Sequence, residues 1–239
     1  MKEIHFKNID STSNHLKSNY VKYENLTFVS ADFQTNGHGR NNRKWESNCN
    51  ENLLFSILIK EKKLINKYKN LSLSSAVVIC EVLKEFMIEN ISIKWPNDVF
   101  VNDRKIAGVL LESVSYGRDI EALILGVGIN VNSVKFGNDM ITQPTSISLE
   151  VDKKICLLEF KNKVYLRFIE MFQNIEREDY SYLRKARNIN YLKGKVVSAN
   201  INGKKALVEV IDINDDNSLK VKKDNEYISL CSGEVSFHL

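Results

Sequence analysis

Residues 34–45 read QTNGHGRNNRKW, a segment whose composition suits neither a helix nor a strand. Gly37 and Gly39 let the backbone adopt conformations closed to other residues and let it approach a ligand closely. Arg40 and Arg43 carry permanent positive charge suited to phosphate or carboxylate groups, and Trp45 offers a flat face for stacking. A solvated basic turn explains this glycine loop equally well on its own, so the rest of the chain has to decide.

Strand-like segments stand on both sides of the glycine loop. Residues 27–31 and 52–59 are apolar and rich in strand-forming side chains, and they predict strands that enter and leave the loop. Residues 71–88 and 157–175 carry apolar side chains at helical spacing, which predicts long helices. The other strands predicted in this region are residues 91–95, 99–101, 104–107, 109–114 and 122–125, with a tight turn at Asn102-Asp103.

The composition and the hydrophobic periodicity of the sequence change after residue 182. Residues 183–195, LRKARNINYLKGK, are basic and weakly periodic, and they predict a linker. From residue 195 onward, five short alternating runs are separated by turn signals, which is typical of a small β-barrel. A unit of about 45 residues has a marginal core of its own. We therefore expect it to dock on the preceding domain or to serve a partner.

The bulk composition is that of a soluble globular enzyme, with 239 residues of which 43% are hydrophobic and 27% charged. The net charge of +4 is spread along the chain and is too weak to indicate nucleic-acid binding. No apolar run approaches the ~20 residues of a membrane span, and the N-terminus has no apolar segment typical of a signal peptide. No CxxC pair occurs, so zinc spacing is absent and a cytoplasmic protein is expected. The cysteines are Cys49, Cys80, Cys156 and Cys231.

Residues 94–98 read KWPND and are a second candidate for chemistry. Pro96 ends the strand because it has no amide hydrogen for a neighbouring strand. Asn97 and Asp98 then present an amide and a carboxylate at a strand end, where ligands of mixed sheets usually bind. An ordinary Pro-Asn-Asp turn is the alternative.

Two further segments place polar groups beside small residues. In residues 104–108, RKIAG, the charge of Lys105 is predicted to face a specific group, and Ala107-Gly108 indicates close approach of a ligand or a second backbone. A solvated lysine is the alternative. Residues 126–132, GVGINVN, favour a floor for a flat ring whose edge the asparagine amides would read, with a strand bulge as the alternative. They are not a Rossmann fingerprint, which needs a third glycine and an acidic residue.

Taken together and in this order, these segments resemble the biotin protein ligase family over about residues 4–135. The shared motifs are Asp10-Ser11-Thr12, Gln34 with Gly37-x-Gly39-Arg40-x-x-Arg43-x-Trp45, Lys94-Trp95-Pro96-Asn97-Asp98, Lys105-x-Ala107-Gly108 and Gly126-x-Gly128-Ile129-Asn130. The tail, residues 232–236, resembles that family's small SH3-like C-terminal domain. The resemblance implies an α+β fold: a mixed β-sheet flanked by helices, class II synthetase-like, in residues 1–186, then a small SH3-like β-barrel in residues 190–239.

The resemblance also implies a reaction in two steps. Biotin and Mg·ATP give biotinyl-5′-adenylate and pyrophosphate. A lysine amine of a biotin carboxyl carrier protein domain, such as that of acetyl-CoA carboxylase, then attacks the mixed anhydride. A carboxylate and a triphosphate repel each other, so cations must neutralise both. Closure of the glycine loop would exclude water, which would otherwise hydrolyse the anhydride.

The implied ligands are biotin, ATP and Mg²⁺, and the resemblance assigns residues to each. The catalytic residues are Lys105, Arg40, Arg43 and Asp98, and Asp98 would aid Mg²⁺ or deprotonate the acceptor lysine. The biotin-binding residues are Ser11, Thr12, Ser13, Gln34, Gly37, His38, Gly39, Arg40, Lys105 and Gly108. The residues that bind ATP and the adenylate are Arg40, Arg43, Trp45, Lys94, Asn97, Lys105, Gly126, Gly128 and Asn130.

The chain departs from the usual family loop, Gly-Arg-Gly-Arg-x-Gly-Arg-x-Trp. His38 replaces the first arginine, which removes a permanent charge. Asn42 replaces the third glycine, and asparagine tolerates the left-handed backbone conformation. Ser13 stands where an asparagine is common. We expect the fold and the reaction to survive these changes, with looser retention of the adenylate.

The motifs also bear on which other functions are alternatives to a biotin ligase. The ligase-like motifs begin at residue 10, which favours a monofunctional ligase without a DNA-binding helix-turn-helix. A lipoate or octanoate ligase or transferase of related fold is the enzymatic alternative, although no cysteine lies in a motif. A non-catalytic nucleotide-binding module is the other alternative, against which Lys105, Arg40 and Asp98 count. The acceptor carboxylase, and the choice between a monomer and a homodimer, stay open.

Overall fold

The computed structural model describes residues 2–137, 142–201, 203–232 and 235–236, and its largest element is a seven-stranded sheet. The strand order is β1-β2-β3-β7-β6-β5-β4. β1 and β2 pair in parallel and the other neighbours are antiparallel, so the sheet is mixed. Its strands are β1 (Glu3–Ile9), β2 (Phe28–Gln34), β3 (Asn52–Ile59), β4 (Ile91–Lys94), β5 (Asp98–Val101), β6 (Arg104–Tyr116) and β7 (Asp119–Asn130).

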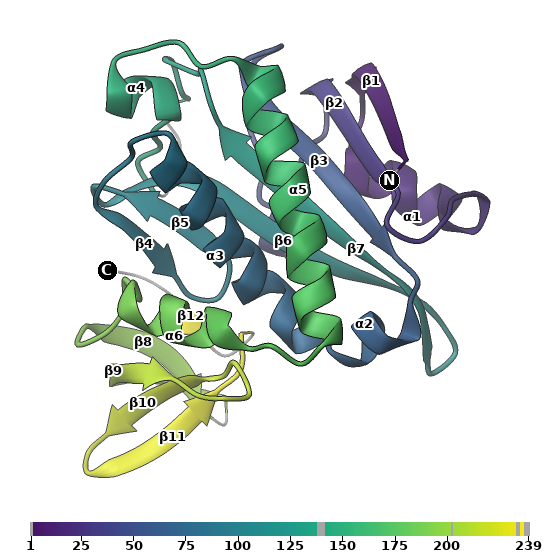
Figure 1. Cartoon of the computed structure of the whole chain (residues 1–239). Helices are drawn as coiled ribbons and strands as arrows, with labels where there is room; N and C mark the ends of the chain where they lie inside the picture. The colour runs from purple at the N-terminus through teal and green to yellow at the C-terminus, as the bar shows by residue number, and fades with distance from the viewer. Residues whose placement is uncertain (1, 138–141, 202, 233–234, 237–239) are drawn as a thin grey trace.

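Helices cover this sheet unequally. The long helices α3 (Tyr68–Glu85) and α5 (Leu157–Glu176) cross one face of it (Figure 1) and share its main core. α1 (Thr12–Asn19) packs on the other face, where Leu16 belongs to a second, smaller apolar cluster. The shorter helices are α2 (Lys62–Asn66), α4 (Ile147–Val151) and α6 (Ser181–Asn188), with 3-10 turns at Tyr20–Lys22 and Arg40–Asn42. Within the described part of the chain, no helix is long and apolar enough to span a bilayer.

The central strand β7 shows why one face of the sheet can hold a ligand. Its odd-numbered residues from 123 to 129 belong to the core under α3 and α5, whereas Ala122 and Ile124 belong to the cluster under α1. Side chains alternate between the faces of a strand. Gly126, Gly128 and Asn130 therefore lie on the α1 side. Because the two glycines have no side chains, the sheet is bare at this point.

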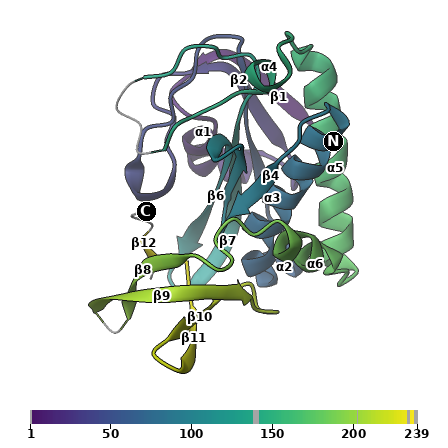
Figure 2. The same cartoon turned by 90° about the vertical axis from the view of Figure 1, so that its left-hand side faces the viewer.

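A five-stranded antiparallel sheet follows, in the order β11-β10-β9-β8-β12. It lies below the 3-10 turn of the glycine loop and next to α6 (Figure 2). Its strands are β8 (Val196–Ile201), β9 (Lys204–Ile213), β10 (Leu219–Lys223), β11 (Glu226–Leu230) and β12 (Val235–Ser236).

Asn217 docks this small sheet on the rest of the molecule. Its carbonyl accepts a hydrogen bond from Trp95 Nε1 (2.9 Å), and its amide nitrogen donates to Asn70 Oδ1 (2.7 Å). Its amide oxygen accepts from the hydroxyl of Tyr182 (3.0 Å). Burial raises the pKa of Tyr182 to about 12, so this hydroxyl keeps the proton that it donates. The small sheet therefore docks, as its marginal core predicts.

The predicted fold class is confirmed, and most predicted elements occur close to their expected bounds. β3 spans the predicted residues 52–59. The predicted hairpin is formed by β5 and β6, and both turn residues, Asn102 and Asp103, have positive φ (49° and 62°). The segments 104–107 and 109–114 form one strand, β6, because Gly108 continues its pairing with Gly128 of β7. β1, α1, α2 and α4 were not predicted.

The predicted linker at residues 183–195 is wrong. Its first half is the end of α6, whose buried Leu183 and Ala186 belong to the main core. The residues that follow α6 pair with β4 along its free edge. Ile93 N donates to Ile189 O (2.8 Å), and Tyr191 N donates to Ile93 O (2.9 Å). Leu183, Ala186 and Ile189 are spaced three apart, which is a helical pattern that the surrounding basic residues hid. Part of the predicted tail motif, Gly233 and Glu234, lies outside the described residues.

Candidate active site

The glycine loop folds as a small hairpin over the bare face of the sheet. Gly39 N donates to Arg43 O (2.7 Å) and Trp45 N donates to Gly37 O (2.9 Å). The residue of this turn that the structure shows in the left-handed region is Asn41 (φ 57°, ψ 35°), one position before the expected Asn42. These bonds set the directions in which the loop presents its side chains.

Under the loop is a cavity of about 610 Å³, a size typical of small-molecule sites. It brings together nearly all the site residues predicted from the sequence: Ser11, Thr12, Ser13, Gln34, His38, Gly39, Arg40, Arg43, Trp45, Lys94, Asn97, Asp98, Lys105, Gly108, Gly126, Gly128 and Asn130. Gly37 does not line it. Instead, Gly37 lies at the base of the hairpin, where a Cβ would come within 3.0 Å of Gln34 Nε2.

One end of the cavity is a hydroxyl-rich cluster at the start of α1. Ser11 caps this helix, with its Oγ accepting from Asn14 N (3.3 Å). Thr12 donates to Gln34 Oε1 from its backbone nitrogen (2.7 Å) and from its hydroxyl (3.1 Å). Ser56 of β3 lies within hydrogen-bond distance of both Thr12 Oγ1 (2.7 Å) and Ser13 Oγ (2.9 Å). The hydroxyl and amide groups of this cluster are therefore ordered and carry no charge.

Trp45 lies on a floor of glycines in the middle of the cavity. Gly108 and Gly128 are paired neighbours on β6 and β7. A Cβ on Gly128 would stand 2.5 Å from Trp45 Cε2, and a Cβ on Gly108 would stand 3.1 Å from Cζ3 of the same ring. The indole of Trp45 therefore lies on Gly108 and Gly128, next to the place where the sequence predicts a floor for a flat ring. Gly126 is covered separately, because its Cβ would meet Ser13 Oγ at 2.7 Å.

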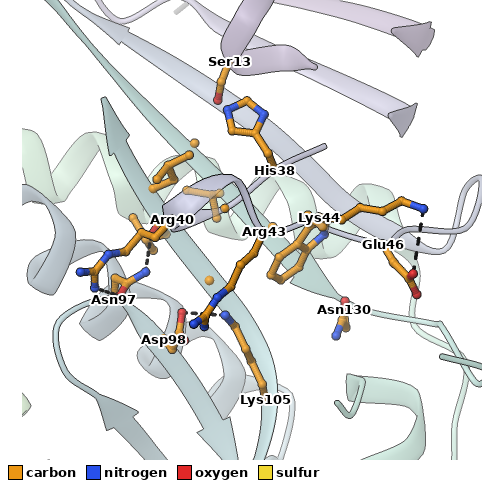
Figure 3. A pocket seen from close by; sticks show the side chains of 18 of the residues that line it. Ser13, His38, Arg40, Arg43, Lys44, Glu46, Asn97, Asp98, Lys105 and Asn130 are labelled. Atoms are coloured by element: carbon orange, nitrogen blue, oxygen red, sulfur yellow. Dashed lines mark hydrogen bonds and ion pairs between the residues drawn. The ribbon is translucent and has the colours of Figure 1, made fainter. Parts of the chain in front are cut away.

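The other end of the cavity gathers positive charge around one carboxylate. Lys105 Nζ lies 2.8 Å from Asp98 Oδ1, beside Arg43 (Figure 3). Arg40 donates to Asn97 Oδ1 (3.2 Å) and to the carbonyl of Ser232 (2.5 Å), so a residue of the C-terminal part holds the loop's arginine. Asn97 is fixed in turn, because its Nδ2 donates to Val109 O (2.7 Å).

Burial and crowding of like charges act on the cations at this end. Burial lowers the pKa of Lys94, and the charges of Lys105, Lys195 and Arg43 lower it further, against the opposing effect of Asp98. Burial also lowers the pKa of Arg40, with Arg43 adding to the effect. An anionic ligand would relieve this repulsion and would replace the water that burial removes. The site is therefore suited to binding a group of high negative charge.

Residues after β7 that the sequence does not predict as part of the site close one side of the cavity. Phe136, Thr142 and Pro144 line it. The segment is held against the start of β6, because Lys105 N donates to Gln143 O (2.9 Å) and Thr145 N donates to Lys105 O (2.9 Å). The predicted Asn130 takes part, with its Nδ2 donating to Thr145 O (3.0 Å). No motif in the sequence marks this segment.

Ser56 was also missed, although the sequence holds a signal for it. It is a polar residue in the middle of the apolar strand NLLFSILI, and it is fully buried. Buried hydroxyls are normally hydrogen-bonded to a specific partner. The other lining residues outside the prediction are Asn41, Lys44, Glu46, Phe55, Trp95, Val109, Leu110 and Val127.

A mixed seven-stranded sheet that carries a glycine hairpin, a cluster of cations and a hydroxyl-rich end in one cavity defines an α+β protein whose cavity suits an anionic ligand. The chain matches the Biotin/lipoate A/B protein ligase family over residues 5–130. It belongs to that family.

Individual relatives agree with this assignment. The chain is 33% identical over 135 residues to the bifunctional ligase/repressor BirA of Salmonella typhimurium, which covers 56% of this chain and 42% of that protein. It is 26% identical to the biotin–[acetyl-CoA-carboxylase] ligase of Paracoccus denitrificans over 164 residues, 66% of this chain and 68% of that protein. The chain spans less than half the length of the ligase/repressor relatives that it matches.

A solved structure extends the similarity over nearly the whole chain. The biotin protein ligase from Aquifex aeolicus, in complex with biotin and ATP, superposes with a TM-score of 0.82 at 27% identity, covering 99% of this chain and 98% of that one. The biotin protein ligase from Leishmania major in complex with biotinyl-5-AMP shares the fold, with a TM-score of 0.64 at 21% identity.

Proposed function

We propose that this chain is a biotin protein ligase, which activates biotin with ATP as biotinyl-5′-AMP and transfers it to a lysine of an acceptor protein. The observation that carries the proposal is the layout of one cavity. Its hydroxyl-rich end suits a neutral ring system, and its cationic end suits a carboxylate facing a triphosphate. The solved Aquifex relative that covers the same length of chain holds biotin and ATP.

In this proposal the cations divide the work at the reacting centre. Lys105, already directed into the cavity by its ion pair with Asp98, stabilises the charge that develops on the α-phosphate as the biotin carboxylate attacks. Arg40 and Arg43 hold the phosphates from the loop, and Lys94 and Asn97 border them from the β4–β5 turn. Positioning by groups that are already ordered lowers the barrier without reorganisation.

The opposite end would hold the biotin ring. Ser11, Thr12, Ser13 and Gln34 supply hydroxyl and amide groups there, and Ser56 keeps Thr12 and Ser13 in place. His38 and Gly39 would cover the ring from the loop, and Gly37 would serve as the hinge of that cover.

The adenine would lie along the glycine floor, bordered by Gly126, Gly128, Asn130 and Trp45. Trp45 lies on Gly128 in the structure, so adenine has to stack on the other face of the indole or displace the ring. Asn130 contributes through the segment that it anchors, since its amide is already bonded to Thr145 O.

Magnesium would enter with ATP as part of the substrate. Among the described residues, no group of three or more His, Cys, Asp or Glu side chains could hold a metal ion. Asp98 is a carboxylate at the cationic end, and Mg²⁺ is commonly bound by one or two carboxylates together with substrate phosphates. The residues therefore fit an ion that is carried mainly by the triphosphate.

The acceptor in this proposal is a biotin carboxyl carrier protein domain, as the name of the Paracoccus relative suggests. Residues 1–186 would form the catalytic domain and residues 190–239 the small C-terminal domain. The protein would act in the cytoplasm without binding DNA or membranes, as a monomer or as a homodimer.

The test is ATP–pyrophosphate exchange with biotin, lipoate or octanoate as the acid. Exchange with biotin alone is expected. Exchange with lipoate or octanoate instead would make the chain a lipoate-type ligase, and no exchange with any acid would overturn the proposal. Lys105→Met should lower the biotin-dependent rate at least about a hundredfold, as loss of a transition-state charge contact does. Lys163→Met, which removes a lysine from the far side of the sheet, should leave the rate unchanged.

A further inference from the structure

Glu112 of β6 joins three elements at the hydroxyl-rich end of the cavity. Its Oε1 accepts a hydrogen bond from Lys17 Nζ of α1, and its Oε2 lies 3.6 Å from His38 Nε2 of the glycine loop. The Glu112 side chain is 22% exposed, and Oε2 is buried without a hydrogen bond in the described part of the chain. A buried carboxylate oxygen without a donor costs free energy, and a cation beside it removes that cost.

His38 is placed so that both of its ring nitrogens face an oxygen. Nδ1 lies 3.4 Å from the carbonyl oxygen of Asn36, and Nε2 faces Glu112. A neutral imidazole has one donor and one acceptor nitrogen. Either neutral tautomer would therefore turn a lone pair toward an oxygen. The imidazolium form donates on both sides and is the form that this position fits.

The other charges around His38 are engaged elsewhere. Lys17 is bonded to the other oxygen of Glu112. Lys44, across the hairpin from His38, directs its Nζ toward Glu46 at 4.0 Å. Figure 3 shows the imidazole pointing from the loop toward Ser13, whereas Arg43 points to the opposite end, where Asp98 lies. Within the described residues, Glu112 is the carboxylate that lies within 4.0 Å of His38.

We infer that Glu112 is a positioning residue that holds the tip of the glycine loop closed by pairing with protonated His38. The inference rests on the proposed function, since the closed loop is what would retain the adenylate. Histidine is the side chain whose charge ordinarily changes near neutral pH, so a contact that needs a charged imidazole is expected to depend on pH. The loop tip therefore has a pH-dependent contact where an arginine would give a permanent one.

The first test measures loop opening without biotin or ATP. Trypsin is expected to cut after Arg40, Arg43 and Lys44 faster when the loop opens, because cleavage by a protease follows local opening of the backbone. Cleavage rates of Glu112→Gln and His38→Gln are divided by the wild-type rate at the same pH, which cancels the pH dependence of trypsin. At about pH 6.5 both variants should be cut about fivefold faster than wild type, and at about pH 8.5 the ratios should approach one.

Two further variants complete this test. Glu85→Gln is the matched control, because Glu85 also bonds two cations, Lys163 and Arg167, but on the other face of the sheet. It should be cut at the wild-type rate at both pH values. His38→Arg adds a trypsin site at residue 38, so only its cleavage after residues 40, 43 and 44 is read, and this should stay slow at both pH values. Ratios near one at both pH values for Glu112→Gln and His38→Gln would overturn the inference; if Glu112→Gln does not fold, His38→Gln alone decides.

The second test measures the dissociation rate of the adenylate from the full chain. In the wild type this rate should rise about fivefold from about pH 6.5 to about pH 8.5. In Glu112→Gln the dissociation rate of the adenylate should be fast and independent of pH. Glu112→Asp should restore part of the pH dependence. If biotin-dependent exchange is absent while the cleavage ratios behave as expected, the proposed function fails and the positioning by Glu112 stands. If biotin-dependent exchange is normal but the cleavage ratios do not change with pH, the proposed function stands and the positioning by Glu112 fails.

Discussion

Gly128 is the residue on which the indole of Trp45 lies, and a methyl group there would stand 2.5 Å from Cε2 of that ring. Such a distance is far below van der Waals contact, so the ring or the strand must move. Because β7 is paired on both sides, we expect the ring to move and the glycine loop to open. Gly128→Ala should lower the free energy of unfolding by about 1–3 kcal/mol, the usual cost of overpacking, and urea unfolding measures it.

A double-mutant cycle with Trp45→Ala tests the cause of this cost. If the contact with the indole is responsible, the cost of Gly128→Ala falls to less than half when Trp45 is absent. An unchanged cost would show that the methyl group strains the strand itself, and the assignment of the floor to Trp45 would be wrong.

The replacement of an arginine by His38 affects the second half of the proposed reaction more than the first. The intermediate has to stay bound until the acceptor lysine arrives, and a permanent charge at the loop tip would help to keep the loop closed. His38→Arg is therefore expected to slow adenylate dissociation several-fold at about pH 8. The measurement is a chase of preformed labelled adenylate with excess unlabelled biotin. An unchanged rate would contradict the prediction.

Single residues also show which parts of the site the sequence reveals. Glycines, arginines and a Trp-Pro-Asn-Asp turn stand out because their backbone needs or charges conflict with an ordinary strand or helix. Ser56 is marked only weakly, as the one polar residue inside an apolar strand, and Glu112 is not marked at all, since a glutamate in a strand is common. Their importance comes from residues far along the chain, such as Thr12 and His38, which the fold brings to them.

Among the structural elements, the junction at Asn217 has the clearest energetic consequence. Asn217 has φ 67°, where alanine is strained, and its side chain makes two hydrogen bonds to the larger part of the molecule. Asn217→Ala should destabilise the protein by about 2–4 kcal/mol from lost hydrogen bonds and backbone strain. Asn217→Gly loses the same hydrogen bonds as Asn217→Ala but avoids the backbone strain. It should therefore be about 1 kcal/mol more stable than Asn217→Ala, as measured by thermal unfolding.

The same pair of variants shows whether docking matters to the site. Arg40 is held by Ser232, so a loosened small sheet would release the loop's arginine. Both variants should therefore raise the KM for ATP. If stability falls but the KM for ATP stays at the wild-type value, the junction serves stability alone.

Hydrophobic periodicity predicts the elements that are buried along their length or on one whole face. It does not predict the elements that are only partly buried. β3 is buried along its whole length and α5 has one apolar face, and the sequence predicts both within a residue or two. β1 alternates between partly buried and exposed residues at the edge of the sheet, so its pattern is weak. The few buried residues of α6 are surrounded by basic ones, so the local pattern predicts a linker there. Tertiary contacts, which the local pattern does not contain, decide such elements.

At the scale of the whole molecule, the N-terminal strand is tied to the long helix α5 by Glu3. The Glu3 carboxylate accepts hydrogen bonds from Lys161 (2.9 Å) and from Ser30 (2.9 Å). Burial raises the pKa of Glu3, but these bonds outweigh it and lower the pKa below the usual 4.5. The pair thus joins the first strand of the sheet to the helix that covers its core.

A pKa that is lower in the folded than in the unfolded state stabilises the fold above the unfolded value. This contribution is lost as the pH falls through the folded pKa. Glu3→Gln should therefore be less stable than wild type by about 1 kcal/mol at pH 7, and the two should converge at about pH 3. Urea unfolding at both pH values measures this, with the exposed Glu24→Gln as the control that shows no such difference. A deficit of Glu3→Gln that is equal at both pH values would show that packing, rather than the charge of Glu3, holds β1 to α5.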